Sequence, residues 1–169
     1  MGWDSQKFGN QVGRAETMNL ELRVPPVIQV VLALVVMWAL SRLAPGLTVS
    51  LAVASWLGGV VIAAGILLAV LGVLEFSKAR TTVDPRYPEQ SAQLVVSGVY
   101  RYSRNPMYLG FLMILLGAAL WLTNLSTLIM LPVFVLYMNR FQIQPEERFM
   151  KQKFGQEYEA YIGRVRRWL

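Results

Sequence analysis

Four apolar runs dominate the sequence, and they constrain the fold more than any other feature. They extend over residues 27–43, 47–76, 107–122 and 127–141. Each is long enough, or nearly so, to cross the roughly 30 Å hydrocarbon core of a bilayer as a helix. With 55% hydrophobic and 15% charged residues, the chain has too little polar surface to cover a soluble globule. We therefore predict an all-α membrane bundle of about four transmembrane helices, as one domain over residues 24–169 after a polar lead-in over residues 1–23.

Positive charge is distributed very unevenly between these runs. Of the 16 Lys and Arg residues, all except Arg42 lie before the first run, between the second and third, or from the end of the fourth onward. The positive-inside rule places these three segments on the cytosolic side. We therefore expect an integral protein of a membrane such as the bacterial inner membrane, with both termini in the cytosol.

The chain contains no cysteine and no histidine. This composition excludes disulfides, thiolate nucleophiles and imidazole acid–base chemistry, and it removes the usual ligands of zinc and haem. We expect no metal cofactor. The net charge of +6 would suggest nucleic acid as the partner of a soluble protein. Here the basic residues flank apolar runs, which favours an anionic bilayer surface instead.

The segment 92–110 is the first of two candidate site blocks. Pro106 suits the first turn of the third apolar helix, and Asn105 is a candidate N-cap residue. A helix N-terminus with Arg101 and Arg104 nearby would receive the carboxylate or phosphate of a ligand. Contact of these residues with lipid headgroups is an alternative of equal weight.

The segment 140–165 is the second block. We expect Pro145 to begin a new helix with Glu146 and Glu147 in its first turn. The two carboxylates would either compensate the helix dipole or hold a cationic or polyhydroxyl ligand. Residues 149–169 mix aromatic and basic side chains, and they predict one or two amphipathic helices on the membrane surface, broken at Gly155.

Both blocks resemble a known family. The first contains Leu94-Val95, Gly98-Val99-Tyr100-Arg101-Tyr102 and Arg104-Asn105-Pro106-Met107-Tyr108-Leu109-Gly110, and the second contains Pro145-Glu146-Glu147, Phe154-Gly155, Tyr158, Tyr161 and Arg164-Val165. This order, with a helical hairpin between the blocks, resembles membrane methyltransferases related to isoprenylcysteine carboxyl methyltransferase and phospholipid N-methyltransferases. The resemblance covers roughly residues 75–169.

The resemblance implies S-adenosylmethionine as the methyl donor, bound at the cytosolic end, and a lipophilic or membrane-resident methyl acceptor. Carried over by position, it implies catalytic roles for Arg104, Tyr108 and Glu147, and contact of Arg140 and Gln142 with the acceptor. The residues that it implies for donor binding are Gln93, Leu94, Val95, Tyr100, Asn105, Pro106, Met107, Tyr108 and Glu146. We expect Arg104 and the start of the third helix to hold the methionine carboxylate, and Glu146 to hold the ammonium group or the ribose.

Three positions depart from the family pattern. Asn105 stands where many relatives have His, and Ala92 and Gln142 stand where the isoprenylcysteine enzymes have His and Arg. The resemblance therefore does not imply prenylated protein as the acceptor, and phospholipid N-methylation is an alternative. A non-catalytic scaffold or transporter subunit is an alternative of another class, but it predicts more polar residues inside the spans than this chain has. The oligomeric state is open, because the small residues of the second run suit contacts within a bundle or a dimer.

Overall fold

The computed structural model describes residues 22, 24–49, 52–79 and 93–169, and these ranges are helical, with turns and loops between the helices. The main helices are α1 (Pro26–Leu43), α2 (Ala52–Lys78), α3 (Pro106–Leu122), α4 (Met130–Tyr137), α5 (Gln144–Phe154) and α6 (Gln156–Ile162). Short helical turns lie between them, namely η1 (Pro45–Leu47), η3 (Gly98–Arg101), η4 (Leu125–Ile129) and the π-helical η5 (Met138–Ile143). Each predicted apolar run forms a helix, which confirms the all-α membrane bundle. The second begins at Ala52 rather than Leu47, because Pro45–Leu47 forms a separate turn. The predicted lead-in, apart from Leu22, lies outside the described residues.

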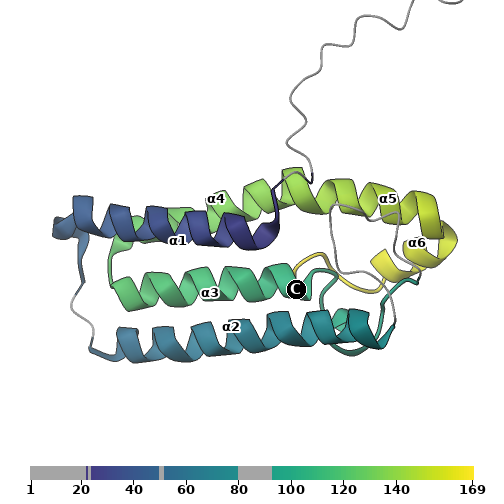
Figure 1. Cartoon of the computed structure of the whole chain (residues 1–169), viewed down its shortest axis with the longest axis horizontal. Coiled ribbons are helices and arrows are strands. Elements are labelled where there is room, and N and C mark those ends of the chain that lie inside the picture. Colours follow the sequence, from purple (N-terminus) through teal and green to yellow (C-terminus); the bar gives the residue numbers. More distant parts are fainter. Residues whose placement is uncertain (1–21, 23, 50–51, 80–92) are drawn as a thin grey trace, which may run out of the picture.

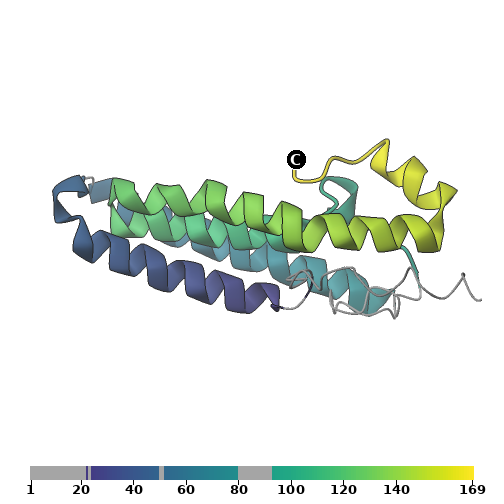
Figure 2. The ribbon, with the colours of Figure 1, turned by 90° about the horizontal axis from the view of Figure 1, so that it is seen from above.

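The four apolar helices lie lengthwise beside one another (Figures 1 and 2). Three segments are apolar and long enough to span a membrane by themselves: Pro26–Leu43, Val53–Lys78 and the continuous helix Leu125–Phe154. The remaining helix, α3, is equally apolar but has 17 residues. It packs chiefly against α2 and also contacts α1 and α4. We call the end at which α1 begins, α2 ends and α3 begins the charged end.

Glycines bring the backbones of α2 and α3 together. A Cβ atom added to Gly65 would lie 2.6 Å from the carbonyl oxygen of Gly110, and one added to Gly110 would lie 2.5 Å from that of Gly65. Gly58 and Gly117 form a second pair of this kind. A Cβ atom added to Gly58 would lie 2.6 Å from the carbonyl oxygen of Gly117, and one added to Gly117 would lie 2.7 Å from that of Gly58. The small residues of the second run therefore serve packing within the bundle.

The turn between α3 and α4 is fixed by the buried side chain of Asn124. Its amide nitrogen donates hydrogen bonds to the carbonyl oxygen of Ala44 at 2.8 Å and to the hydroxyl oxygen of Thr48 at 3.1 Å. Its carbonyl oxygen accepts the backbone N–H of Ser126 at 3.0 Å. One side chain thus joins the two turns at the end of the bundle away from the charged end.

Pro145, Glu146 and Glu147 lie in the first turn of α5, as predicted, but the fourth apolar helix does not end near Phe141, and that prediction was wrong. The helix passes through the π-helical turn η5 and continues as α5 to Phe154 (Figure 2). In an α-helix the N–H of residue 145 would bond to the carbonyl of Phe141, and proline has no N–H. That carbonyl accepts the backbone N–H of Leu22 at 3.1 Å instead. The predicted break at Gly155 is confirmed, because α5 ends at Phe154 and Gly155 has a positive φ of 49°.

Candidate active site

A cavity at the charged end gathers most of the predicted site residues. Its empty space, including the part open to solvent, measures about 640 Å³. Its walls come from the end of α2, the segment before η3, η3 itself, the start of α3, and α5 and α6. The lining residues are Phe76, Gln93, Leu94, Val95, Tyr100, Arg104, Asn105, Met107, Tyr108, Glu146, Glu147, Met150, Tyr158 and Tyr161.

Three predicted site residues do not line this cavity. Pro106 is buried in the first turn of α3. Gln142 is buried in η5 and contacts a lining residue rather than the cavity. Arg140 is exposed, and its guanidinium lies over the ring of Phe141, 5.4 Å from the centroid.

The carboxylate of Glu146 is held by two side chains from different helices. The hydroxyl of Tyr108, on α3, donates to Oε1 of Glu146 at 2.5 Å. The amide of Gln142, one turn earlier on the same helix as Glu146, donates to the same oxygen at 2.8 Å. Both bonds end on Oε1, so the carboxylate is oriented while Oε2 receives neither of them.

Two hydrogen-bond donors of the lining are buried without a partner among the described residues. They are the hydroxyl of Tyr100 and Nε of Arg104. Buried polar groups are nearly always hydrogen-bonded, so each such exception needs an explanation. Burial also raises the pKa of Tyr100 and Tyr158 well above the ordinary value, and that of Tyr161 to about 12. These phenols are therefore neutral donors at physiological pH.

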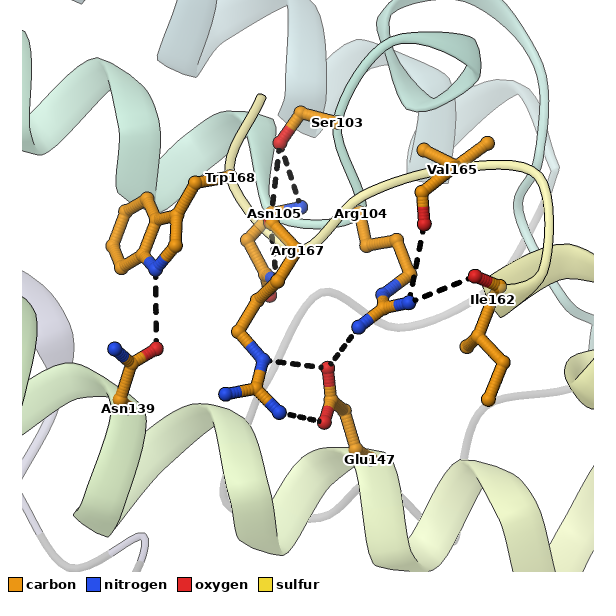
Figure 3. Close-up of polar contacts among 9 residues, drawn as sticks. All are labelled: Ser103, Arg104, Asn105, Asn139, Glu147, Ile162, Val165, Arg167 and Trp168. Carbon is orange, nitrogen blue, oxygen red and sulfur yellow. Dashed lines mark hydrogen bonds and ion pairs between the residues drawn. The ribbon is translucent and has the colours of Figure 1, made fainter.

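Glu147 joins two arginines beside the cavity, as Figure 3 shows. Nη2 of Arg104 lies 2.8 Å from Oε1 of Glu147. Arg167 approaches the same carboxylate with two donors, Nε at 3.0 Å from Oε1 and Nη2 at 2.6 Å from Oε2. Nη1 of Arg104 donates to the carbonyl oxygens of Ile162 and Val165. The predicted catalytic pair Arg104 and Glu147 is therefore already engaged in holding residues 162–167.

The segment after α6 runs back to the start of α3 and is fastened there. The backbone N–H of Arg104 donates to the carbonyl of Arg166 at 3.0 Å. The side-chain amide of Asn105 donates to the carbonyl of Arg167 at 3.0 Å (Figure 3). Asn105 occupies the N-cap position of α3, which confirms that prediction, although its side chain makes no capping bond. The indole of Trp168 donates to Asn139 at 3.1 Å, which ties the same segment to η5.

The aromatic residues of α6 close the cavity instead of facing outward as on a surface helix. Tyr158, Tyr161 and Val165 form a buried cluster against Leu94, Met150 and Phe154. The hydroxyl of Tyr161 donates to the carbonyl oxygen of Tyr100 at 2.8 Å. The two predicted amphipathic helices are thus present as α5 and α6, and the apolar face of α6 packs against the protein.

Four lining residues were not predicted as site residues: Phe76, Met150, Tyr158 and Tyr161. Tyr158 and Tyr161 belong to the second sequence block, and their spacing of three places them on one helical face, so a signal for them existed. Phe76 and Met150 are ordinary apolar residues of their helices, and nothing local distinguishes them. Arg167 gave no signal either, because its partner lies 20 residues earlier.

Comparison with known proteins gives one family model and several relatives. The family model described as phospholipid methyltransferase matches residues 53–157. The chain is 48% identical over 63 residues, 37% of its length, to the whole of an uncharacterized protein of Haemophilus influenzae. It is 36% identical over 115 residues to a probable protein-S-isoprenylcysteine O-methyltransferase of Oryza sativa subsp. indica, covering 66% of this chain and 58% of that protein.

A protein-S-isoprenylcysteine O-methyltransferase of Saccharomyces cerevisiae is 33% identical over 111 residues, which cover 60% of this chain and 45% of the yeast protein. The chain thus spans about half the length of these two curated relatives. No solved structure matches the chain.

Proposed function

The chain belongs to the phospholipid methyltransferase family, and from this premise we propose that it transfers a methyl group from S-adenosylmethionine to a lipophilic or membrane-resident acceptor. One observation carries the proposal. A single cavity holds an oriented carboxylate, Glu146, and two buried donor atoms that no described residue satisfies, the hydroxyl of Tyr100 and Nε of Arg104. A ligand with both a cationic and an anionic group would satisfy them together, and the amino-acid end of S-adenosylmethionine has both.

In this proposal the donor's groups are divided between the two sides of the cavity. Nε of Arg104 and the hydroxyl of Tyr100 receive the methionine carboxylate, since both are buried donors that no described residue satisfies. Glu146 receives the ammonium group or a ribose hydroxyl through the oxygen that Tyr108 and Gln142 leave available. The remaining predicted donor contacts, with Gln93, Leu94, Val95, Asn105 and Met107, are the cavity wall.

When bound, S-adenosylmethionine supplies a methyl group on a positively charged sulfur, which an acceptor nucleophile displaces in line. The chain's contribution is alignment, which can account for much of the rate of such a reaction. Five aromatic side chains line the cavity and favour a cation there by cation–π attraction: Phe76, Tyr100, Tyr108, Tyr158 and Tyr161.

We propose revised roles for four of the residues predicted from sequence. Glu147 acts as a positioning residue, because its ion pairs with Arg104 and Arg167 hold the segment that closes the cavity, and Arg104 adds this role to its contact with the methionine carboxylate. Gln142 positions Glu146 rather than binding the acceptor. Arg140, outside the cavity, is proposed as a contact only for an acceptor that approaches along α4.

The proposed orientation places the charged end in the cytosol, with the chain in a membrane such as the bacterial inner membrane. The soluble donor then enters from the cytosol and the lipophilic acceptor from the bilayer. A phospholipid amine remains an alternative acceptor to a carboxylate or a thiol. No residue that lines the cavity in the described part of the chain distinguishes between these acceptor groups.

Replacing Glu146 with glutamine is expected to weaken S-adenosylhomocysteine binding about 10-fold or more, because a charge-assisted hydrogen bond contributes about 1.5–3 kcal/mol. Isothermal titration calorimetry of the purified protein measures this. Glu157→Gln, an identical change at an exposed residue of α6, is the control and should bind as the unmodified protein does. Equal affinity in the Glu146 and Glu157 variants would remove Glu146 from the donor site. If S-adenosylhomocysteine produced neither heat nor thermal stabilisation with the folded unmodified protein, the donor proposal itself would be refuted.

Methyl transfer is tested with S-adenosylmethionine labelled in its methyl group. Membranes that contain the protein should pass label to a lipid or small molecule, and membranes with Glu146→Gln should pass less. Mass spectrometry of the labelled product identifies the acceptor class. Donor binding without any transfer above that of protein-free membranes would favour the non-catalytic alternative.

A further inference from the structure

A second hollow lies on the other side of Tyr161 from the proposed donor cavity. It opens between η3 and the end of α6, and it is lined by Val96, Arg101, Tyr161, Arg164 and Val165. Two arginines are thus the charged members of its lining, Arg101 in η3 and Arg164 just after α6. The proposed function uses neither of them.

Both guanidinium groups are exposed and able to bind a ligand. Arg101 makes no hydrogen bond or ion pair with another described residue. The charge of Arg101 acts on the carboxylate of Glu75, which is bonded to Lys78 at 2.7 Å and to Ser97 at 2.6 Å. Arg164 donates only Nε, to the carbonyl oxygen of Ala160 at 3.1 Å. Two guanidinium forks without a carboxylate between them suit the oxygens of a phosphate.

We expect the hollow to lie at the level of the lipid headgroups. With 27 residues, α2 is about 40 Å long, and the hydrocarbon core is about 30 Å thick. The last turns of α2 therefore reach into the headgroup region. There Glu75 accepts the hydroxyl of Ser97 and lies against Gly98, the first residue of η3. This contact holds η3, and Arg101 with it, beside the phosphates of the bilayer.

We propose that Arg101 and Arg164 together bind the phosphate group of an anionic ligand. Bound phosphate links η3 to α6 and so fixes Tyr161, which lines both the hollow and the donor cavity. Tyr161 also donates to the carbonyl of Tyr100 within η3. The phosphate thus stabilises the closed arrangement of α6, and it does so whether or not the chain transfers methyl groups.

The test is the thermal unfolding midpoint of the purified protein in nanodiscs. Nanodiscs of phosphatidylcholine with added phosphatidylglycerol should raise the midpoint above that in phosphatidylcholine alone, because a ligand that binds only the folded state stabilises it. The double variant Arg101→Gln/Arg164→Gln should lose at least about half of that shift. Arg166→Gln, an exposed arginine of the same segment outside the hollow, is the matched control and should retain it.

A third arm separates the sources of phosphate. Inorganic phosphate added to phosphatidylcholine nanodiscs should reproduce the shift if the site takes a free anion, and should fail to do so if the site takes a lipid headgroup. Either result supports a phosphate site if the double variant abolishes the shift in the unfolding midpoint. Equal shifts in the double variant, in Arg166→Gln and in the unmodified protein would overturn the proposal, since general attraction to an anionic surface would then suffice. The single variants repeat the comparison should the double variant not fold.

Discussion

Replacing Glu147 with glutamine is expected to destabilise the protein by about 2–4 kcal/mol, because it leaves two arginines without their carboxylate. The side chains of Arg104, Arg167 and Glu147 are 14%, 33% and 21% exposed, so they are screened more than a fully buried cluster. The free energy of unfolding in detergent measures the effect. A second measure is digestion with trypsin, which should cut faster after Arg164 and Arg166, since the segment that contains them is released.

The matched control is Glu159→Gln. Glu159 pairs with Lys151 at 2.9 Å, and the two side chains are 51% and 61% exposed. An exposed pair of this kind contributes at most about 1 kcal/mol, so the control should resemble the unmodified protein. If the two variants unfolded at the same midpoint, the cluster around Glu147 would have no structural importance.

Replacing Gly110 with valine is expected to cost more than about 3 kcal/mol, beyond the usual range for overpacking, because the new side chain would meet backbone. Its Cβ would lie 2.5 Å from the carbonyl oxygen of Gly65 and 2.9 Å from the backbone nitrogen of Ala69. Neither atom can move without separating α2 from α3. Little folded protein should be recovered, and size-exclusion chromatography with thermal unfolding measures both the yield and the stability.

Gly46→Val provides the control for this substitution. Gly46 lies in the exposed turn η1, with nothing within 4 Å of an added Cβ. The same change in side chain should therefore leave yield and midpoint nearly unchanged. Normal stability of Gly110→Val would mean that the two helices do not touch at this point. The contact also concerns the site, because α2 carries Phe76 and α3 carries Tyr108 into the cavity.

The sequence predicts the membrane helices well, because a span is specified by local composition. Hydrophobic length alone identified the four runs, and Gly155 marked the end of α5 through its backbone freedom. The end of the fourth helix was missed for a local reason as well. Pro145 favours a helix start, but the π-helical turn before it and the donation from Leu22 allow the helix to continue.

The residues that line the cavity could be predicted only where they belong to a sequence motif. Eight of the nine residues assigned to donor binding line it, since the motifs contain those positions. Their hydrogen bonds could not be predicted, because they join residues far apart in the chain. Asn105 looked like an N-cap residue, and its amide bonds to Arg167, 62 residues later. Arg104 looked like a free ligand contact, and most of its donors are engaged by residues 147–165.

The attachment of residues 162–168 to the start of α3 has a consequence for biogenesis. Glu147 is synthesised after Arg104 but 20 residues ahead of Arg167, a delay of roughly 1–4 s at ordinary rates of synthesis. All four apolar helices have been made by then, while the cavity still lacks the wall that α6 supplies. The four apolar helices are therefore synthesised before the segment that closes the cavity. A quality-control system that recognises only failed membrane insertion would not recognise a chain whose cavity had not closed.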